Sequence, residues 1–300
     1  MSGANRLAQR ASAVWSPLVT LVLLLLPVRA WAHHVAGHGS SEGVRNINSI
    51  GSRGGAARSR IMLLDEFSHS GVGIVPGQRN ELSLLGEYAP IPAFSFGAQL
   101  PFLVVAEQPE DGPSRTALGY GDTRAFIRYT PHADKLIHRV LTFGVWASFP
   151  TRTVRSVVDT GRIWTVSPSV IFTRTYDRLY WQVLALGSFE TRPAGLALDL
   201  SAGAQVGARV ADNTLSIGGG VLVDVRALNA CRQVNGELAY CSGSRAGERD
   251  REVGSTRATA LANLAWNIDV RWAINLGVQV PFTRKRDFDV GLALGVSAVF

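Results

Sequence analysis

The sequence has only one long run of apolar residues, and it lies close to the N-terminus. This run covers residues 19 to 28 (VTLVLLLLPV), which is far short of the roughly 20 apolar residues that a membrane-spanning helix needs. No later stretch is long enough to cross a bilayer as a helix. The run is expected to be a cleaved signal, with a transmembrane anchor as the alternative, and no membrane-spanning helix is expected after it.

Histidine and cysteine are also scarce, with 6 and 2 residues in the chain of 300. Nucleophilic catalysis needs a nucleophile, a base and an orienting partner, and no such motif surrounds His69, His132 or His138. We therefore expect no enzyme, no catalytic residue and no cofactor. A hydrolase is the third alternative for the function of this chain.

The two cysteines, Cys231 and Cys241, lie in one long polar segment. In an oxidising compartment such a pair is expected to form a disulfide bond. The bond would contribute about 3 kcal/mol in the chain-entropy model, acting mainly on the local order of that segment. No histidine lies nearby, so a metal site at the two thiols is not expected.

The first residues have the organisation of a secretory signal peptide. Arg6 and Arg10 precede the apolar run, and Ala30-Trp31-Ala32 follows it as a small-x-small cleavage pattern. We predict that residues 1–32 are the signal. Residues 33–57 are rich in Gly, Ser and Arg and are predicted to be a disordered periplasmic tail. Three imidazoles in this tail are weak candidates for binding copper, nickel or zinc, at His33, His34 and His38.

Basic residues outnumber acidic ones, giving a net charge of +7 and a pI near 10.0. In a soluble protein this balance suggests a nucleic-acid partner. Neither a basic helix nor an aromatic RNA-binding motif accompanies it, so we expect no nucleic acid. Several arginines fall in predicted outer loops, either as solvated charge or as partners of lipopolysaccharide phosphates: Arg152, Arg155, Arg245, Arg249 and Arg251.

Alternation of apolar with polar or small residues dominates the rest of the chain. In LDLSAGAQVGARV, residues 198 to 210, every second residue is apolar. Side chains of a strand alternate between its two faces, so one face is wholly apolar and the other is polar or small. The segment 213–226 repeats the pattern after a tight turn, which predicts a hairpin.

About twelve segments of this kind are predicted to be strands. Most have about 10 to 15 residues, longer than the usual 5 to 6 of globular strands and suited to crossing a membrane at a tilt. Their ranges are 58–69, 81–88, 92–106, 118–130, 138–149, 163–175, 178–191, 196–210, 213–226, 255–268, 270–281 and 287–300.

The connections between these segments alternate in length. Short turns alternate with long polar loops at 107–117, 150–162 and 227–254. This alternation, with an even strand count and both ends on the periplasmic side, is typical of an outer-membrane barrel of Gram-negative bacteria. We predict an all-β, up-and-down, transmembrane antiparallel β-barrel over residues 58–300. A soluble β-sandwich would have no reason to keep the alternation.

The final segment, ALGVSAVF, is apolar and ends on an aromatic residue. An apolar terminal strand has to be paired, so we expect it to close the barrel against the first strand. Phe300, Ala298 and Val296 resemble the C-terminal signal by which outer-membrane proteins are inserted. The expected partners are therefore the barrel-assembly machinery, outer-membrane lipid with lipopolysaccharide, and a small-molecule cargo.

Tryptophans lie in or near the ends of several predicted strands, where a membrane barrel carries its aromatic girdles. Ordinary packing is the alternative for Trp146, Trp164, Trp181, Trp266 and Trp272. One strand breaks the alternation: in 178–191 the face that should be polar carries Leu184 and Leu186, which leaves the orientation of this strand open.

Four short motifs resemble an outer-membrane family named for the meta pathway of phenol degradation. They are Leu100-Pro101-Phe102, Gly119-Tyr120-Gly121-Asp122, Ile127-Arg128-Tyr129 and Phe149-Pro150-Thr151. The resemblance covers roughly residues 58–300 and implies an outer-membrane channel. We expect passive passage of a small molecule, hydrophobic or aromatic cargo being one option. A non-transporting structural or surface-interaction barrel is the alternative.

Strand parity also predicts which side chains line the lumen. Asp122 is expected to point into the lumen with Arg124 and Arg128, as a structural salt-bridged cluster or, as the alternative, in a substrate-binding role. A barrel of about twelve strands has either a narrow channel or a plugged lumen. The lumen candidates are Glu87, Gln99, Asp122, Arg124, Arg128, Asp199, Gln205, Arg209, Asp224, Arg226, Asn263, Asn275 and Gln279.

Overall fold

The structure is a computed structural model that describes most of the predicted barrel. The described residues are 59–70, 77–107, 113–134, 139–154, 163–192, 195–211, 214–232, 238–240, 253–269, 271–283 and 288–300. The predicted signal and tail, with His33, His34 and His38, fall outside them, as do Cys241 and the side chain of Cys231. No helix among the described residues is long and apolar enough to cross a membrane.

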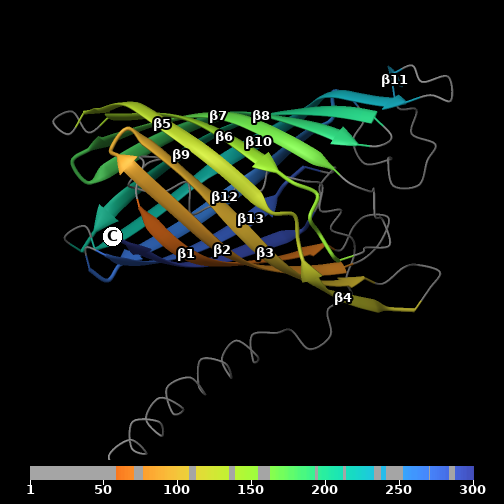
Figure 1. Cartoon of the computed structure of the whole chain (residues 1–300). Coiled ribbons are helices and arrows are strands. Elements are labelled where there is room, and N and C mark those ends of the chain that lie inside the picture. The colour runs from red at the N-terminus through yellow and green to blue at the C-terminus, as the bar shows by residue number, and fades with distance from the viewer. Residues whose placement is uncertain are drawn as a thin grey trace, which may run out of the picture. The chain divides into compact units, whose positions relative to one another are not determined.

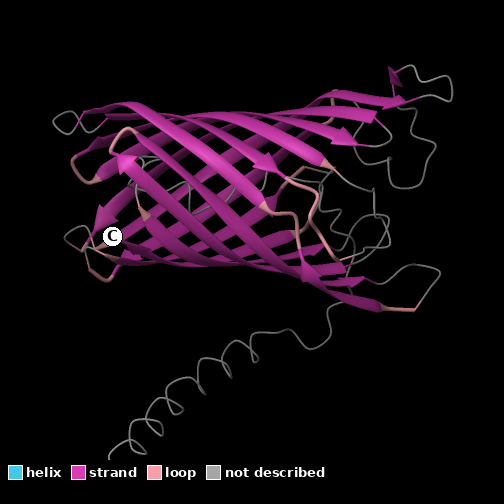
Figure 2. Ribbon diagram, viewed as in Figure 1, coloured by secondary structure: helices cyan, strands magenta, loops and turns pink. Residues whose placement is uncertain are grey.

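The described chain forms one antiparallel sheet that closes on itself (Figures 1 and 2). Each strand of the ring pairs with its neighbours in sequence, and β14 pairs with β1. The twelve strands of the ring are β1 (Arg60–Ser70), β2 (Gly77–Ile91), β3 (Phe94–Glu107), β5 (Arg124–Asp134), β6 (Arg139–Ser148), β7 (Trp164–Tyr176), β8 (Leu179–Arg192), β9 (Gly195–Val210), β10 (Leu215–Arg232), β12 (Thr256–Asn267), β13 (Trp272–Pro281) and β14 (Val290–Val299). This confirms the predicted twelve-stranded barrel.

Two further strands are short additions to the ring. β4 (Arg115–Tyr120) pairs with the C-terminal part of β3, and β5 pairs with its N-terminal part. β4 and β5 therefore follow each other along the same edge of β3, with a break between them. β11 (Leu238–Tyr240) pairs with the last residues of β10. The predicted strand 118–130 is therefore divided, and the predicted strand 213–226 is longer than its alternation indicated.

Both ends of the barrel chain meet at one end of the barrel. Arg60 lies opposite Val299, and the Phe300 N–H donates to the Ser59 carbonyl over 3.1 Å. The final strand therefore closes against the first, as predicted. We call this the turn end, because it also carries the connections at 92–93, 177–178 and 211–214; the opposite end is the loop end (Figure 1).

Local hydrogen bonds define the turn between β12 and β13. The Asp269 carboxylate accepts the N–H groups of Trp272 and Arg271 over 2.6 and 2.7 Å. These bonds favour the ionised carboxylate and lower the pKa of Asp269 below its usual value. In the turn between β7 and β8, Asp177 has a φ of 52°, a left-handed conformation that short polar residues tolerate.

The outer face of the barrel is apolar. Along each strand, exposed Leu, Ile, Val and aromatic side chains alternate with buried, mostly polar ones; β7 alternates in this way over most of its length. In a closed barrel the buried set faces inward. The exposed set gives the barrel the lipid-facing surface of a transmembrane β-barrel.

Exposed aromatic side chains gather toward both ends of the outer face. Those at the turn end include Tyr88, Tyr129, Tyr176, Trp181, Trp266 and Trp272, and those toward the loop end include Tyr120, Trp164 and Phe189. Two such girdles mark the interfaces of a membrane. Trp146 does not belong to a girdle, because its side chain is buried on the inner face of β6; for this residue the alternative of ordinary packing holds.

Pro168 interrupts the ladder between β7 and β8. The register is continuous from Val166 opposite Phe189 to Ser169 opposite Leu186, but the two positions between them form no bridge. Proline has no N–H to donate, so one ladder hydrogen bond is missing from the middle of the wall.

We expect Pro168→Val to raise the free energy of unfolding by about 1 kcal/mol, because it restores a backbone donor. Urea titration of the refolded barrel, followed by tryptophan fluorescence, measures the change. Val170→Pro, which removes the next N–H on the same side of β7, is expected to destabilise. A lower urea midpoint for Pro168→Val would contradict this account of the interruption.

Candidate functional site

The inner face of the barrel is the candidate site. All the predicted lumen residues except Asp122 lie on strands with the parity of the inward-facing set; Arg209, Asn275 and Gln279 are half-buried and the others are buried. Sequence parity located these residues, but it did not identify their partners.

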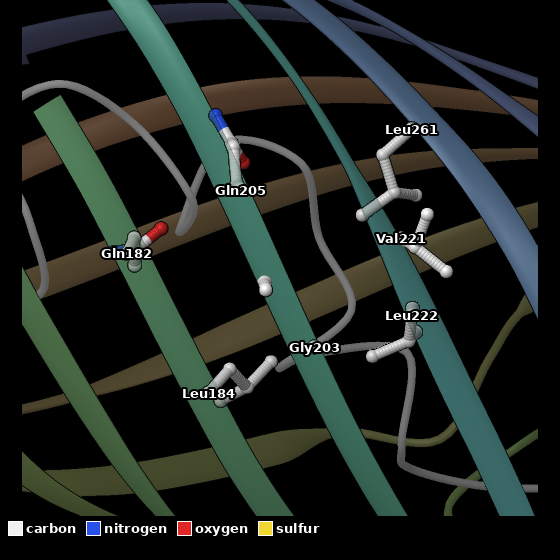
Figure 3. Close-up of a pocket in the computed structure, with 8 residues that line it drawn as sticks. Gln182, Leu184, Gly203, Gln205, Val221, Leu222 and Leu261 are labelled. Atoms are coloured by element: carbon white, nitrogen blue, oxygen red, sulfur yellow. The ribbon is translucent and has the colours of Figure 1, made fainter. Parts of the chain in front are cut away.

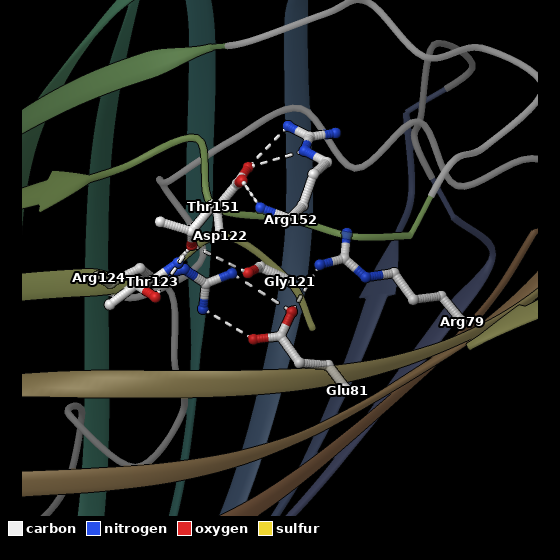
Figure 4. A network of polar contacts seen from close by, with 8 residues as sticks. All are labelled: Arg79, Glu81, Gly121, Asp122, Thr123, Arg124, Thr151 and Arg152. Carbon is white, nitrogen blue, oxygen red and sulfur yellow. Dashed lines mark hydrogen bonds and ion pairs between the residues drawn. The ribbon is translucent and has the colours of Figure 1, made fainter. Parts of the chain in front are cut away.

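Asp122 is placed differently from the prediction. It lies in the interruption between β4 and β5 (Figure 4). Its carboxylate accepts hydrogen bonds from the backbone N–H of Arg152 over 3.1 Å and from the Arg152 Nε over 3.0 Å, and the Arg152 Nη2 lies 2.7 Å away. The predicted cluster with Arg124 and Arg128 is therefore wrong in its acidic member. Those two arginines pair with glutamates of β2 instead.

The segments that carry the motifs come together around this interruption. The Gly121 N–H donates to the Pro101 carbonyl over 2.9 Å, and the Phe149 N–H donates to the Thr123 carbonyl over 2.9 Å. The Thr151 hydroxyl accepts the Thr123 N–H over 2.8 Å. The chain after β6 thus supplies the hydrogen bonds that the broken strand lacks, which fixes the wall at this point.

Glu81 and two arginines form an ion cluster on the loop-end side of the inner face (Figure 4). Arg79 Nη2 lies 2.5 Å from Glu81 Oε2, and Arg124 Nη1 lies 2.8 Å from Glu81 Oε1. The Ser83 hydroxyl donates to the same carboxylate over 3.0 Å. The cluster was missed because the predicted strand began at residue 81, so Arg79 was left in a loop.

A second cluster lies closer to the turn end. Glu87 accepts Arg60 Nε over 2.8 Å and the Ser95 hydroxyl over 2.7 Å, and Arg128 Nη1 lies 3.4 Å away. In each of the two clusters one carboxylate contacts two guanidinium groups.

The opposite part of the wall carries balanced charges. Arg226 Nε lies 2.6 Å from Asp199 Oδ1, and the Ser201 hydroxyl donates to Asp224. Arg209 Nη2 donates to the Thr175 hydroxyl over 3.3 Å. Charges of both signs therefore face the interior, and they occur largely as pairs.

An apolar belt separates these ionic groups along the axis. On β5, Phe126 lies between Arg124 and Arg128, and on β2, Leu85 lies between Glu81 and Glu87. The belt comes from nine strands and consists of Met62, Leu64, Leu85, Phe126, Trp146, Ile171, Leu184, Leu186, Leu222, Leu261 and Ala293. Leu184 and Leu186, whose position on the expected polar face left the orientation of their strand open, face inward and belong to this belt.

The belt contains an aromatic cluster that touches one of the arginines. The rings of Phe126 and Trp146 stack with centroids 4.3 Å apart. The guanidinium carbon of Arg128 lies 5.0 and 5.8 Å from these two centroids, within the range of a cation–π contact. The arrangement presents an apolar surface beside a fixed positive charge.

Tyr180 crosses the inner face near the turn end. Its hydroxyl accepts Gln205 Nε2 over 3.2 Å, and the same amide donates to Asn263 over 2.9 Å. The ring passes Gly207 and Gly218, which lie opposite each other on β9 and β10. A Cβ on either glycine would come closer than 3.0 Å to Tyr180, so the absence of side chains makes room for the ring.

A small cavity lies in the apolar belt, next to Gly203 (Figure 3). Its volume is about 10 Å³ and its wall includes Leu184, Leu222 and Leu261, with Gln182 and Gln205 at its polar side. That space is about enough for one water molecule. Among the described residues, no group of His, Cys, Asp or Glu is arranged to hold a metal ion.

Comparison with known proteins gives similarity of fold alone. No family model and no curated protein sequence matches the chain. It is similar to an outer membrane channel from Pseudomonas putida, with a TM-score of 0.55 and 14% identity over 81% of this chain and 96% of that one. The transport unit of the autotransporter AIDA-I from Escherichia coli gives 0.49 and 10% identity, over 87% and 97%. The KdgM porin gives 0.45 and 12% identity, over 80% and 99%.

Proposed function

We propose that this protein is a channel of the bacterial outer membrane for passive passage of a small molecule, and that hydrophobic or aromatic molecules are its cargo. The observation that carries the proposal is the apolar belt inside a closed barrel. A general porin has a polar, water-filled interior, whereas this interior places apolar and aromatic side chains between two groups of ion pairs.

The outer face supports the proposed membrane location. An apolar exterior with aromatic residues toward both ends fits a bilayer, and the similar Pseudomonas putida structure is named an outer membrane channel. In this location the turn end faces the periplasm and the loop end faces the outside. The predicted signal peptide and the C-terminal signal at Val296, Ala298 and Phe300 belong to the same proposal, since they would direct export and insertion.

The belt and the ion pairs have separate roles in the proposed passage. Ion pairs on the inner wall link strands of the ring, β9 with β10 and β2 with β5 across β3, and give the entrance fixed charges. The belt favours cargo that gains from leaving water, at about 25 cal/mol for each Å² of apolar surface buried. The aromatic pair of Phe126 and Trp146 offers a stacking surface within the belt.

Single-channel recording of the purified, refolded protein in planar bilayers tests the proposal. Proteins with and without residues 33–57 are compared, because the predicted tail is a candidate plug. Stable open steps support a channel, and larger steps without the tail support a plug. A folded barrel that is silent in both forms would favour the alternative of a non-transporting structural or surface-interaction barrel.

Trp146→Ala is expected to raise the single-channel conductance and to reduce the preference for aromatic over polar solutes of equal size. The belt loses its largest side chain, which is 4% exposed and stacks on Phe126. Liposome swelling with matched solutes measures the preference. Trp266→Ala is the matched control, since Trp266 is 49% exposed on the outer face; equal effects of the two changes would contradict a role for the belt.

A further inference from the structure

Two arginines lie side by side on the outer face of the barrel at the turn end. Arg139 of β6 is directly opposite Arg174 of β7. Their neighbours Thr142, Thr173 and Thr175 are buried and face inward, so strand parity places both arginines outward. Like charges directly opposite each other on one face of a sheet destabilise it, so an anion bound beside this pair would stabilise the barrel.

Aromatic side chains lie beside the two arginines on the outer face. Arg174 lies opposite Trp181 of β8, and the rings of Trp181 and Phe172 are 5.2 Å apart. Tyr176, two residues beyond Arg174, is 72% exposed. The arginines therefore lie within the turn-end girdle, at the depth where headgroups begin.

Hydrogen bonding leaves one nitrogen of each arginine unused. Both side chains are half-buried, and within the part of the chain that the structure describes the Nε atom of each is buried without a hydrogen-bond partner. The register puts one acidic position, Asp134 of β5, opposite Arg139. Guanidinium groups suit phosphate because they donate two hydrogen bonds in parallel.

We propose that Arg139 and Arg174, flanked by Trp181, bind the phosphodiester of an anionic phospholipid in the leaflet at the turn end. This site is separate from the interior, but it rests on the proposed membrane location. Lipid chains would lie along the apolar outer face of β6 to β8, and the phosphate would neutralise the two guanidinium groups.

Native mass spectrometry of the folded protein in a neutral detergent tests the site, with phosphatidylglycerol as probe and phosphatidylcholine as comparison. Arg139→Gln with Arg174→Gln is expected to weaken phosphatidylglycerol binding about tenfold or more. Arg178→Gln with Arg271→Gln is the matched control, since it removes two exposed arginines from the same end. Equal losses in the two double variants, or no loss in the first, would overturn the proposal.

Three further measurements separate the sources of failure. Inorganic phosphate in excess should not displace the lipid; if it does, the site binds free phosphate and not a lipid. Lipid A should bind both double variants alike, because its leaflet is at the loop end.

If the glutamine variant does not fold, Arg139→Lys with Arg174→Lys should bind phosphatidylglycerol more weakly than the native protein, because lysine lacks the bidentate geometry; unchanged binding overturns the proposal. Channel conductance is measured on the same samples, so loss of lipid binding with normal conductance leaves the proposed function standing.

Discussion

Gly218→Ala and Gly207→Ala are each expected to lower the free energy of unfolding by about 1–3 kcal/mol, although each adds only one methyl group. The new Cβ would lie closer than 3.0 Å to Tyr180, and at Gly218 also to Asn263 and Gln205. The ring must then leave its place, and the hydrogen bonds among Tyr180, Gln205 and Asn263 are lost with it.

Urea titration of the refolded barrel measures the change, with Gly86→Ala as the matched control. Gly86 also lies in a barrel strand, but an added Cβ there would have no atom within 4 Å, so its midpoint should hardly move. A double-mutant cycle with Tyr180→Ala gives the sharper test. In the Tyr180→Ala protein, Gly218→Ala should lower the free energy of unfolding only slightly. If it lowers this free energy as much as in the native protein, the close contact with Tyr180 is not the cause.

Glu81→Gln is expected to destabilise the barrel by about 3–5 kcal/mol, because it removes a charged partner of the buried Arg124 and of the half-buried Arg79. The side chains of Glu81 and Arg124 are only 3% and 5% exposed. Asp122→Asn should cost only about 1 kcal/mol or less, since it breaks the more exposed pair with Arg152. Urea midpoints of the two variants give the comparison.

A third variant separates net stabilisation from the cost of breaking the cluster. Replacing Arg79, Glu81 and Arg124 together by methionine, leucine and methionine removes all three charges at once. Burying charges costs as much as their attraction returns, so this variant is expected to be close to the native stability. If Glu81→Gln were as mild as Asp122→Asn, the cluster would be hydrated in the folded protein and the proposed burial would be wrong.

The sequence predicted the barrel because the relevant signal is local. Alternation within each segment gave the strands, and the lengths of the connections gave their up-and-down order. Errors arose where the local pattern was weak. Arg79 precedes the clear alternation of β2, so the strand was predicted four residues too short at its start, and the Glu81 cluster was not foreseen.

The interior could be predicted only as a set of inward positions. The sequence assigned Arg124 and Arg128 to the lumen by parity, but it gave them Asp122 as partner because Asp122 is close in sequence. The register of β3 against β5 brings them near β2 instead, to Glu81 and Glu87, which are 43 and 41 residues away. Pairing across strands depends on register, which is not encoded within any single strand.

By itself the sequence determined the closed, twelve-stranded membrane barrel and its inward and outward faces, because strand parity is a property of consecutive residues. Only the tertiary structure decided what the inner face is. Belt residues such as Leu64, Phe126 and Leu222 are apolar interruptions in the mostly polar inward faces of their own strands. They form one apolar belt only because closure and register bring them to the same level of the barrel. The same register places Arg139 beside Arg174, since a contact between strands is set by their alignment in space and not by their separation along the chain.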